Sequence, residues 1–353
     1  MSKKKFLDFH DGITSQRPFL MYVGARNLGK SYQVKDWMIR DYFKNNHQFC
    51  YSRRFKDDNE LTAPDYFNDV LDNFKKIKTF EYRKIGKLDC YIINGNLAGY
   101  SIAVNQYTKM KSVSWPDLYN IVFDEFIPEN GRYIGGKFAA KREPELCFNF
   151  FQSVARKKGE PYKKGVRFFL LSNSVSEDNP YYQYFNIDER IRHGAKKIIE
   201  RGLYFEQPSS EDYEVIDILR ESDFGDLIAG TKYGSYALDN DYYLDNNNFI
   251  LDSKEEIPKD KEFIFNIVFG IKKFGVYFCK NDGLYYVINK YNKGSSLNYA
   301  LSNDGHTINT ILVEKSKNKE SVKLLRDAYE LGFVRFQTLE CKNILTGFLG
   351  ITI

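Results

Sequence analysis

The feature that most constrains the fold is the stretch FLMYVGARNLGKSYQVKDW at residues 19–37. An apolar run leads into a loop that begins at Gly24 and ends in Gly29, Lys30 and Ser31, and a helix-like run follows. The spacing G-x-x-x-x-G-K-[ST] is that of a phosphate-binding loop, because its glycines let backbone N–H groups face phosphate oxygens. The positive end of the helix dipole attracts the same anion. The stretch predicts a nucleotide site.

The expected roles in this site follow from the side chains. Lys30 should reach the β- and γ-phosphates of ATP, and the Ser31 hydroxyl should bind Mg²⁺. Asn173, at the end of the strand-like run FFLLSN, is a candidate sensor of the γ-phosphate; an asparagine satisfied by backbone groups is the alternative. The predicted nucleotide contacts are Gly24, Ala25, Arg26, Asn27, Leu28, Gly29, Lys30, Ser31, Tyr32 and Asn173.

A second motif, NIVFDEFIP at residues 120–128, supplies the acidic groups that a nucleoside triphosphatase needs. Ile121–Phe123 is a short apolar run of the kind that forms a buried parallel strand, and ligands gather at the carboxyl ends of such strands. Asp124 is therefore the expected Mg²⁺ ligand, acting through water. Glu125 is the expected general base that polarises the attacking water. Strands often end in solvated acids, so the motif carries weight only together with the phosphate loop.

The overall composition sets limits on the chain. With 353 residues and 42% hydrophobic content, it is long enough for two domains. The net charge of +5 permits nucleic-acid binding without demanding it. Five scattered cysteines favour a reducing compartment and core positions over disulfides or zinc. No apolar run is long enough to cross a membrane.

The first half of the chain alternates strand-like and helix-like runs, which is typical of a parallel α/β sheet. The expected strands are 19–23, 48–52, 90–94, 101–104, 121–123 and 166–172, and the expected helices are 31–43, 63–74 and 143–157. From about residue 225 the composition shifts to β-strands that turn at Lys272–Lys273 and at Asn281–Gly283, with a late helix at 319–331. This divides the chain into an ATPase domain (1–203), a linker (204–225) and a smaller α+β domain (226–353).

Several motifs together resemble the DNA-packaging (encapsidation) ATPase of the small podophages, the Picovirinae-type genome motors related to large terminases. They are GARNLGKS, YSRRFK at 51–56, IVFDEFIP, LLSNSVS at 170–176, NPYYQYFN at 179–186 and FGDLIAGTKYGSYALDN at 224–240. The resemblance implies a P-loop ATPase domain of the ASCE type, with a mostly parallel sheet, joined to an RNase H-like domain. It also implies a pentameric ring at the capsid portal, docked through a packaging RNA, that drives double-stranded DNA into a preformed shell in the host cytoplasm.

The same resemblance assigns Arg156 as an arginine finger that acts in the site of a neighbouring subunit. Other basic residues leave alternatives open. Arg53, Arg54 and Lys56 are expected to contact the nucleotide or a neighbour, or else to form surface salt bridges. A loop with Lys109 and Lys111 would suit sequence-independent contacts to DNA phosphates, although a plain surface lysine pair is as good an interpretation. The lysines 157, 158, 163 and 164 are expected to be solvated or to contact DNA.

The second domain departs from the pattern of an active nuclease. Such an enzyme needs clustered carboxylates that hold two metal ions. The segment FIFNIVFGIKKFG has no acid within the strand and offers Gly270 where the strand ends. We therefore expect a catalytically inactive domain that binds nucleic acid. Two other functions remain open on the sequence: another ring NTPase, such as a helicase or a DNA-transfer motor, and a nucleotide-gated DNA-binding scaffold.

Overall fold

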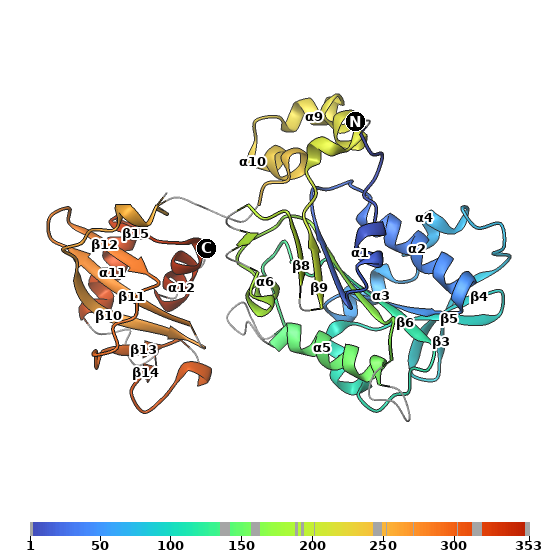
Figure 1. Cartoon of the computed structure of the whole chain (residues 1–353), viewed down its shortest axis with the longest axis horizontal. Coiled ribbons are helices and arrows are strands. Elements are labelled where there is room, and N and C mark those ends of the chain that lie inside the picture. The colour runs from blue at the N-terminus through green and yellow to red at the C-terminus, as the bar shows by residue number, and fades with distance from the viewer. Residues whose placement is uncertain are drawn as a thin grey trace. The chain divides into compact units, whose positions relative to one another are not determined.

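A computed structural model of the chain divides into two compact units, Met1–Leu244 and Asp245–Ile353. Each is described by itself (Figure 1). The residues that the structure describes are 3–134, 142–156, 163–187, 190–191, 194–200, 202–242, 249–251, 253–270, 272–301, 303–312 and 320–349. Within these residues, no helix combines the length and the apolar character needed to cross a membrane.

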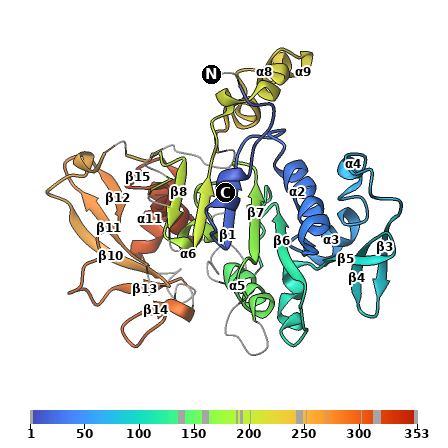
Figure 2. The same ribbon diagram turned by 45° about the vertical axis from the view of Figure 1, so that its right-hand side comes forward.

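The first unit is built on a nine-stranded sheet of order β3-β4-β5-β2-β6-β7-β1-β9-β8. Its strands are β1 (Phe19–Val23), β2 (Gln48–Ser52), β3 (Phe80–Ile85), β4 (Leu88–Ile93), β5 (Asn96–Ser101), β6 (Leu118–Asp124), β7 (Arg167–Ser172), β8 (Lys197–Glu200) and β9 (Leu203–Glu206). The strands from β5 to β9 in this order pair in parallel, and the outer strands β3, β4 and β8 pair antiparallel with their neighbours. Figure 2 shows β1, β7 and β6 side by side in the middle of this sheet.

The helices cover both faces of the sheet, because the central strands are apolar on both sides. Alternate residues of β1 lie in different cores: Met21 packs with the α5 side chains and Leu20 with the α2 side chains. The helices of the first unit are α1 (His10–Thr14), α2 (Lys30–Asn45), α3 (Lys56–Thr62), α4 (Asn68–Leu71), η1 (Val104–Met110), α5 (Arg142–Ala155), α6 (Pro180–Phe185), η2 (Ser210–Asp212), α8 (Glu214–Arg220), α9 (Asp223–Ile228), α10 (Lys232–Gly234) and the π-helical η3 (Ser235–Asp239).

The strand order confirms the predicted fold class. β7 lies between β1, which leads into the phosphate loop, and β6, which ends at the acidic pair. A single strand inserted between the strand of the phosphate loop and the strand that carries the acidic pair is the arrangement typical of ASCE-type ATPases. The predicted strands at 19–23 and 48–52 are observed, the one at 121–123 lies within β6, and the one at 166–172 corresponds to β7, which starts one residue later.

Several local predictions for the first unit were wrong. The expected helix 63–74 is absent; α3 ends at Thr62, because Pro64 has no backbone N–H to continue the helical hydrogen bonds, and only the short α4 follows. The expected strand 101–104 lies instead at Asn96–Ser101, because Asn94 and Gly95, both with positive φ, close a tight hairpin between β4 and β5. Part of the expected linker 204–225 is β9, and the division between the two units falls at 244/245.

The second unit is a six-stranded mixed sheet of order β14-β13-β10-β11-β12-β15. Its elements are η4 (Lys254–Glu256), β10 (Glu262–Phe269), β11 (Lys272–Cys279), β12 (Leu284–Ile288), β13 (Asn298–Ala300), η5 (Asn303–Gly305), β14 (Ile311–Leu312), α11 (Glu320–Glu330), β15 (Val334–Phe336) and α12 (Leu339–Leu349). The predicted turn at Asn281–Gly283 joins β11 to β12, whereas the turn placed at Lys272–Lys273 comes earlier, since β11 already starts at Lys272. The predicted helix 319–331 corresponds to α11.

The cysteines behave as the sequence indicated. Cys50, Cys90, Cys147, Cys279 and Cys341 are all free and buried. They therefore serve as small core side chains.

Candidate nucleotide-binding site

The phosphate loop connects β1 to α2, as the sequence predicted. Gly29 precedes the first residue of α2 with a φ of 79°, a left-handed conformation that glycine adopts without steric cost. A Cβ atom at this position would also lie 2.9 Å from a ring carbon of Phe6, so the packing leaves no room for a side chain. Asn27 has a positive φ as well. The loop therefore curls around a space at the N-terminus of a sixteen-residue helix, where an anion is stabilised.

Lys30 points into that space from the first turn of α2. Its Nζ atom donates hydrogen bonds to the carbonyl oxygens of Gly24 (3.0 Å) and Ala25 (2.7 Å) and to Oδ1 of Asn173 (3.1 Å). The residue is only 8% exposed. Burial lowers the pKa of its ammonium group to about 7, while the nearby Asp124 opposes this shift and Arg26 adds to it. A phosphate in the loop would supply the negative charge that this buried cation lacks.

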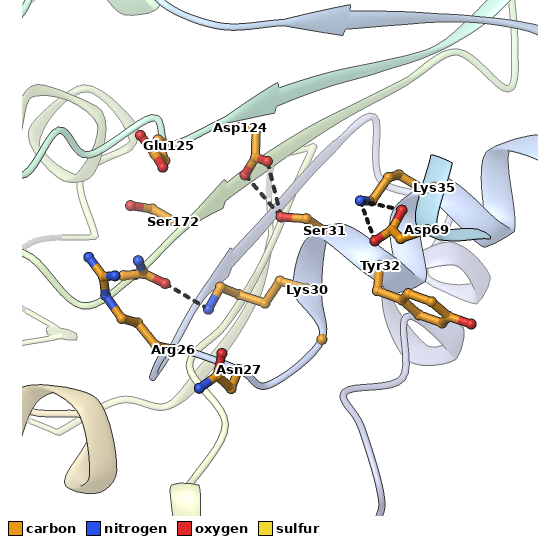
Figure 3. Close-up of a pocket in the computed structure, with 12 residues that line it drawn as sticks. Arg26, Asn27, Lys30, Ser31, Tyr32, Lys35, Asp69, Asp124, Glu125 and Ser172 are labelled. Carbon is orange, nitrogen blue, oxygen red and sulfur yellow. Dashed lines mark hydrogen bonds and ion pairs between the residues drawn. The ribbon is translucent and has the colours of Figure 1, made fainter. Parts of the chain in front are cut away.

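The Ser31 hydroxyl and the Asp124 carboxylate meet at the end of β6. Ser31 Oγ lies 3.0 Å and 3.2 Å from the two carboxylate oxygens (Figure 3). Hydroxyl and carboxylate oxygens are the hard donors that Mg²⁺ prefers, usually with water and substrate phosphates completing its shell. The predicted pair is thus brought together across 93 residues of sequence.

Glu125 follows Asp124 and leaves the sheet. It has a φ of 62°, which is unusual for a residue with a side chain and is found at functional sites where neighbouring contacts enforce it. Its carboxylate is half exposed and forms an ion pair with the Arg53 guanidinium group at the end of β2. Arg53 therefore contacts the proposed general base within the same chain.

Arg54 is a correction to the sequence prediction, which placed it on the nucleotide, on a neighbour or in a surface ion pair. It is buried, and its guanidinium group forms hydrogen bonds of 3.0–3.1 Å with both carboxylate oxygens of Glu143 on α5. It also donates to the backbone carbonyls of Glu125 (3.1 Å) and Phe126 (2.6 Å). Arg54 thus holds the backbone on which Glu125 sits.

The loop and the acidic strand end enclose a cavity of about 300 Å³. The sequence predicted ten nucleotide contacts. Seven of them line this cavity, and Gly24, Ala25 and Leu28 do not. The lining residues are Arg26, Asn27, Gly29, Lys30, Ser31, Tyr32, Lys35, Asp69, Asp124, Glu125, Ser172 and Asn173. Lys35 and Asp69, which form an ion pair with each other at 2.7 Å, were not predicted from the sequence.

Arg26 connects the phosphate loop to the helical segment near the end of the first unit. Its guanidinium group pairs with Glu129 and lies over the rings of Tyr233 and Tyr236, at 6.0 and 5.6 Å from their centroids. The Tyr236 hydroxyl donates to the same Glu129 carboxylate at 2.9 Å. No local pattern predicts this contact, although Tyr233 and Tyr236 lie in the motif at 224–240 that contributes to the family resemblance.

The remaining predicted residues lie away from the cavity. Lys56 is exposed and forms an ion pair of 3.1 Å with Glu60 one turn along α3. Lys109 is exposed near the end of η1, and the exposed Lys111 follows it. Arg156, just after α5, is exposed and donates to the Lys111 carbonyl at 3.3 Å. The expected loop at Lys109 is thus partly helical, and Arg156 contacts the residue that follows the end of this helix.

Lys163 is a second correction among the basic residues. It is buried, and its ammonium group donates to the carbonyls of Trp115 (3.0 Å), Pro116 (3.2 Å) and Leu118 (2.8 Å). It closes a backbone turn and does not face solvent. Lys164 is exposed, and Lys157 and Lys158 lie outside the described residues.

The comparisons with known proteins agree over nearly the whole chain. Residues 1–351 match the family model for the podovirus DNA encapsidation protein (Gp16). The DNA packaging proteins of Bacillus phages PZA and phi29 are each 32% identical over 346 residues, covering 98% of this chain and 97% of the relative. A chain of the bacteriophage phi29 viral genome packaging motor assembly superposes with a TM-score of 0.70 at 30% identity, covering 97% of both chains.

Proposed function

The chain belongs to the podovirus DNA encapsidation protein (Gp16) family, and we propose that it hydrolyses ATP at its phosphate loop to drive double-stranded viral DNA into a preformed capsid. The observation that carries this proposal is the cavity in which Lys30, the Ser31–Asp124 pair and Glu125 converge. Catalysis of phosphoryl transfer depends almost entirely on positioning the reactants and stabilising the developing charge. Each of these groups can serve one of those two roles.

ATP would bind as its magnesium complex. Ser31 and Asp124 would hold the metal ion, whose positive charge offsets negative charge on the phosphates. Lys30 would exchange its contacts with the loop carbonyls for the β- and γ-phosphate oxygens. Asn173, already within hydrogen-bonding distance of Lys30, would report on the γ-phosphate. Glu125, once free of Arg53, would orient the attacking water and accept its proton.

We propose that the active form is a homomeric ring of five subunits, docked at the capsid portal through a packaging RNA in the host cytoplasm. In such a ring, Arg156 would act in trans on the γ-phosphate bound by the neighbouring subunit. Two observations support this role. Arg156 is exposed on the surface, and it does not line the cavity of its own subunit. Lys109 and Lys111 beside it would contact DNA phosphates without reading sequence.

A DNase-protection assay tests the proposed function. With ATP, purified chain and empty capsids that carry the portal and packaging RNA, viral double-stranded DNA should become resistant to added DNase, and omission of ATP should leave it fully digestible. A helicase would instead separate the strands of the duplex. A nucleotide-gated scaffold would bind DNA without protecting it or consuming ATP in proportion.

We further propose that the second unit has no nuclease activity and binds nucleic acid. At the centre of its first strand stands Asn266, a neutral and fully buried residue. The Asn266 amide donates to the Asn292 carbonyl (2.8 Å) and to Oδ1 of Asn298 (2.7 Å), and its own oxygen accepts the Asn292 N–H at 3.0 Å. This side chain is therefore fully engaged in holding neighbouring segments and carries no charge for a metal ion.

The corresponding prediction concerns DNA integrity. Prolonged incubation of the full chain with supercoiled and linear DNA and with Mg²⁺ or Mn²⁺ should leave both substrates uncut, because two-metal cleavage requires clustered carboxylates. Gel electrophoresis provides the measurement. Metal-dependent cleavage that a point substitution in residues 245–353 removes would overturn the proposal, and cleavage that persists through such substitutions would point to a contaminant.

A further inference from the structure

The charge of the chain is concentrated in one short segment, KKIKTFEYRKIGK at residues 75–87. We call this segment the basic hairpin; it consists of residues 75–87, which include β3 and the turn that leads to β4. It contains six basic residues and one acidic residue, Glu81, so its net charge is +5. This equals the net charge of the whole chain. The rest of the molecule is therefore neutral overall. The basic residues are Lys75, Lys76, Lys78, Arg83, Lys84 and Lys87, and all six are exposed.

The basic hairpin lies at one edge of the nine-stranded sheet. β3 is the edge strand and pairs antiparallel with β4. The pairing register runs from Lys84 through Asp89 and Ser101 to Tyr51 and then to Val122 on β6, two residues before Asp124. The turn after Lys84 consequently lies at the end of the sheet where the parallel strands β2, β5 and β6 finish. The nucleotide cavity lies at that same end. Gly86 in that turn has no atom within 4 Å of an added Cβ, so the tip is open to solvent.

Aromatic packing holds the basic hairpin in place. The rings of Phe80 and Tyr82 lie 5.9 and 5.2 Å from the ring of Tyr91 on the neighbouring strand β4. Phe80 also packs against Phe67, at 6.1 Å between ring centroids. Phe80 and Tyr82 are thus partly buried against the neighbouring strand and anchor β3, whereas its basic residues Arg83 and Lys84 are exposed.

Most of this positive charge is uncompensated. Arg83 is 3.6 Å from Glu81 and Lys84 is 4.0 Å from Asp89, which are long ion pairs on exposed side chains and contribute little. Within the described part of the chain, Lys75, Lys76, Lys78 and Lys87 have no carboxylate within ion-pair distance. Lysines can protect an edge strand from aggregation. Three of the six basic residues, however, come before β3 begins, so edge protection does not account for them.

We propose that the basic hairpin is a binding site for the phosphate backbone of a nucleic acid. The inference rests on the proposed function for the identity of the polyanion, and it assigns contact residues distinct from the Lys109 loop. A strand of six residues is about 20 Å long, a length over which duplex DNA presents roughly a dozen phosphate charges. The six exposed basic residues lie on this strand and on the segments that flank it, and they can contact several of these phosphates without reading sequence.

Nucleic-acid binding by the full chain, measured by fluorescence anisotropy, tests this site. The probes are a short duplex DNA and a folded RNA, each titrated at salt concentrations from about 50 to 200 mM. The test variant carries Lys78→Gln and Lys87→Gln. The matched control carries Lys44→Gln and Lys196→Gln, two other exposed lysines of the first unit with the same change in charge.

The test variant should bind at least one probe about tenfold to a hundredfold more weakly at moderate salt, with the salt slope reduced by about 2. The control should match wild type. A loss of affinity for the DNA probe, for the RNA probe or for both supports the site and identifies its ligand. Equal affinities and slopes for test and control overturn it, as does a loss confined to self-association, which would indicate a protein partner. Hydrolysis of ATP without nucleic acid should be unchanged in both variants; its absence in wild type would refute the proposed function independently.

Discussion

Replacing Lys30 with alanine should abolish ATP hydrolysis and, with it, DNA packaging. The Nζ atom of Lys30 is the buried cation at the mouth of the phosphate loop, held by the Gly24 and Ala25 carbonyls and Asn173. Without it, the charge that develops on the β- and γ-phosphates meets no fixed ammonium group in a site that is shielded from water. Steady-state phosphate release and DNase protection should both fall to background.

The control for this prediction lies on the same helix. Lys44→Ala removes an exposed lysine of α2 and should leave hydrolysis unchanged. Circular dichroism should show that Lys30→Ala remains folded, since the substitution removes a desolvated charge from the protein interior. Near-normal turnover in folded Lys30→Ala would rule out the assignment of the phosphate loop.

Mixed rings provide the second large effect. Glu125→Gln should retain binding of ATP with Mg²⁺ yet turn over about a hundredfold or more slowly, because an amide cannot accept the proton of the attacking water. Arg156→Ala should also bind nucleotide and slow hydrolysis about a thousandfold, the usual scale for loss of an arginine finger. Each variant alone is therefore nearly inactive, and the phosphate-release rate of each is the baseline for the mixture.

Mixing the two variants should restore part of the ATPase activity. Some interfaces then pair an intact Glu125 on one subunit with an intact Arg156 on the next, and such a site is complete. Lys164→Ala, which removes another exposed basic residue of the first unit, is the control and should not behave like Arg156→Ala. If sedimentation shows that mixed rings assemble but they stay inactive at every ratio, Arg156 does not act in trans. Full activity of Arg156→Ala by itself would remove Arg156 from the site altogether.

The centre of the site could be predicted from the sequence because its signals are local. The loop from Gly24 to Ser31 lies between a strand and a helix, and the acidic pair Asp124–Glu125 directly follows an apolar run. Each pattern constrains the backbone within a few residues, and parallel strands bring their carboxyl ends to a common edge. The structure places the Ser31 hydroxyl against Asp124 as that reasoning requires.

The partners of the basic residues could not be predicted, because they depend on contacts between distant segments. Arg53 and Arg54 are adjacent in sequence, yet one faces Glu125 at the cavity and the other is buried against Glu143. Lys163 lies in a lysine-rich run that favours exposure, but it satisfies three carbonyls some 45 residues earlier in the chain. The turn at Asn94–Gly95, in contrast, has a local signal, because asparagine followed by glycine favours a tight hairpin. The predicted strand 101–104 did not take this signal into account, and the observed strand β5 begins at Asn96.

The buried Arg54–Glu143 pair limits how this protein can change over evolutionary time. Removing one member of a buried ion pair leaves an uncompensated charge and costs about 3–5 kcal/mol, a large share of the roughly 5–15 kcal/mol that stabilises a domain. Glu143 also accepts from the Tyr181 hydroxyl and the Ile134 N–H, so its loss would leave those donors without an acceptor as well. Replacing both residues with apolar ones would remove the charge imbalance but would still leave these donors, and the two carbonyls that Arg54 contacts, without partners. We therefore expect positions 54 and 143 to be retained or changed together among relatives, and the contact of Arg54 with the Glu125 carbonyl extends this constraint to the backbone of the proposed general base.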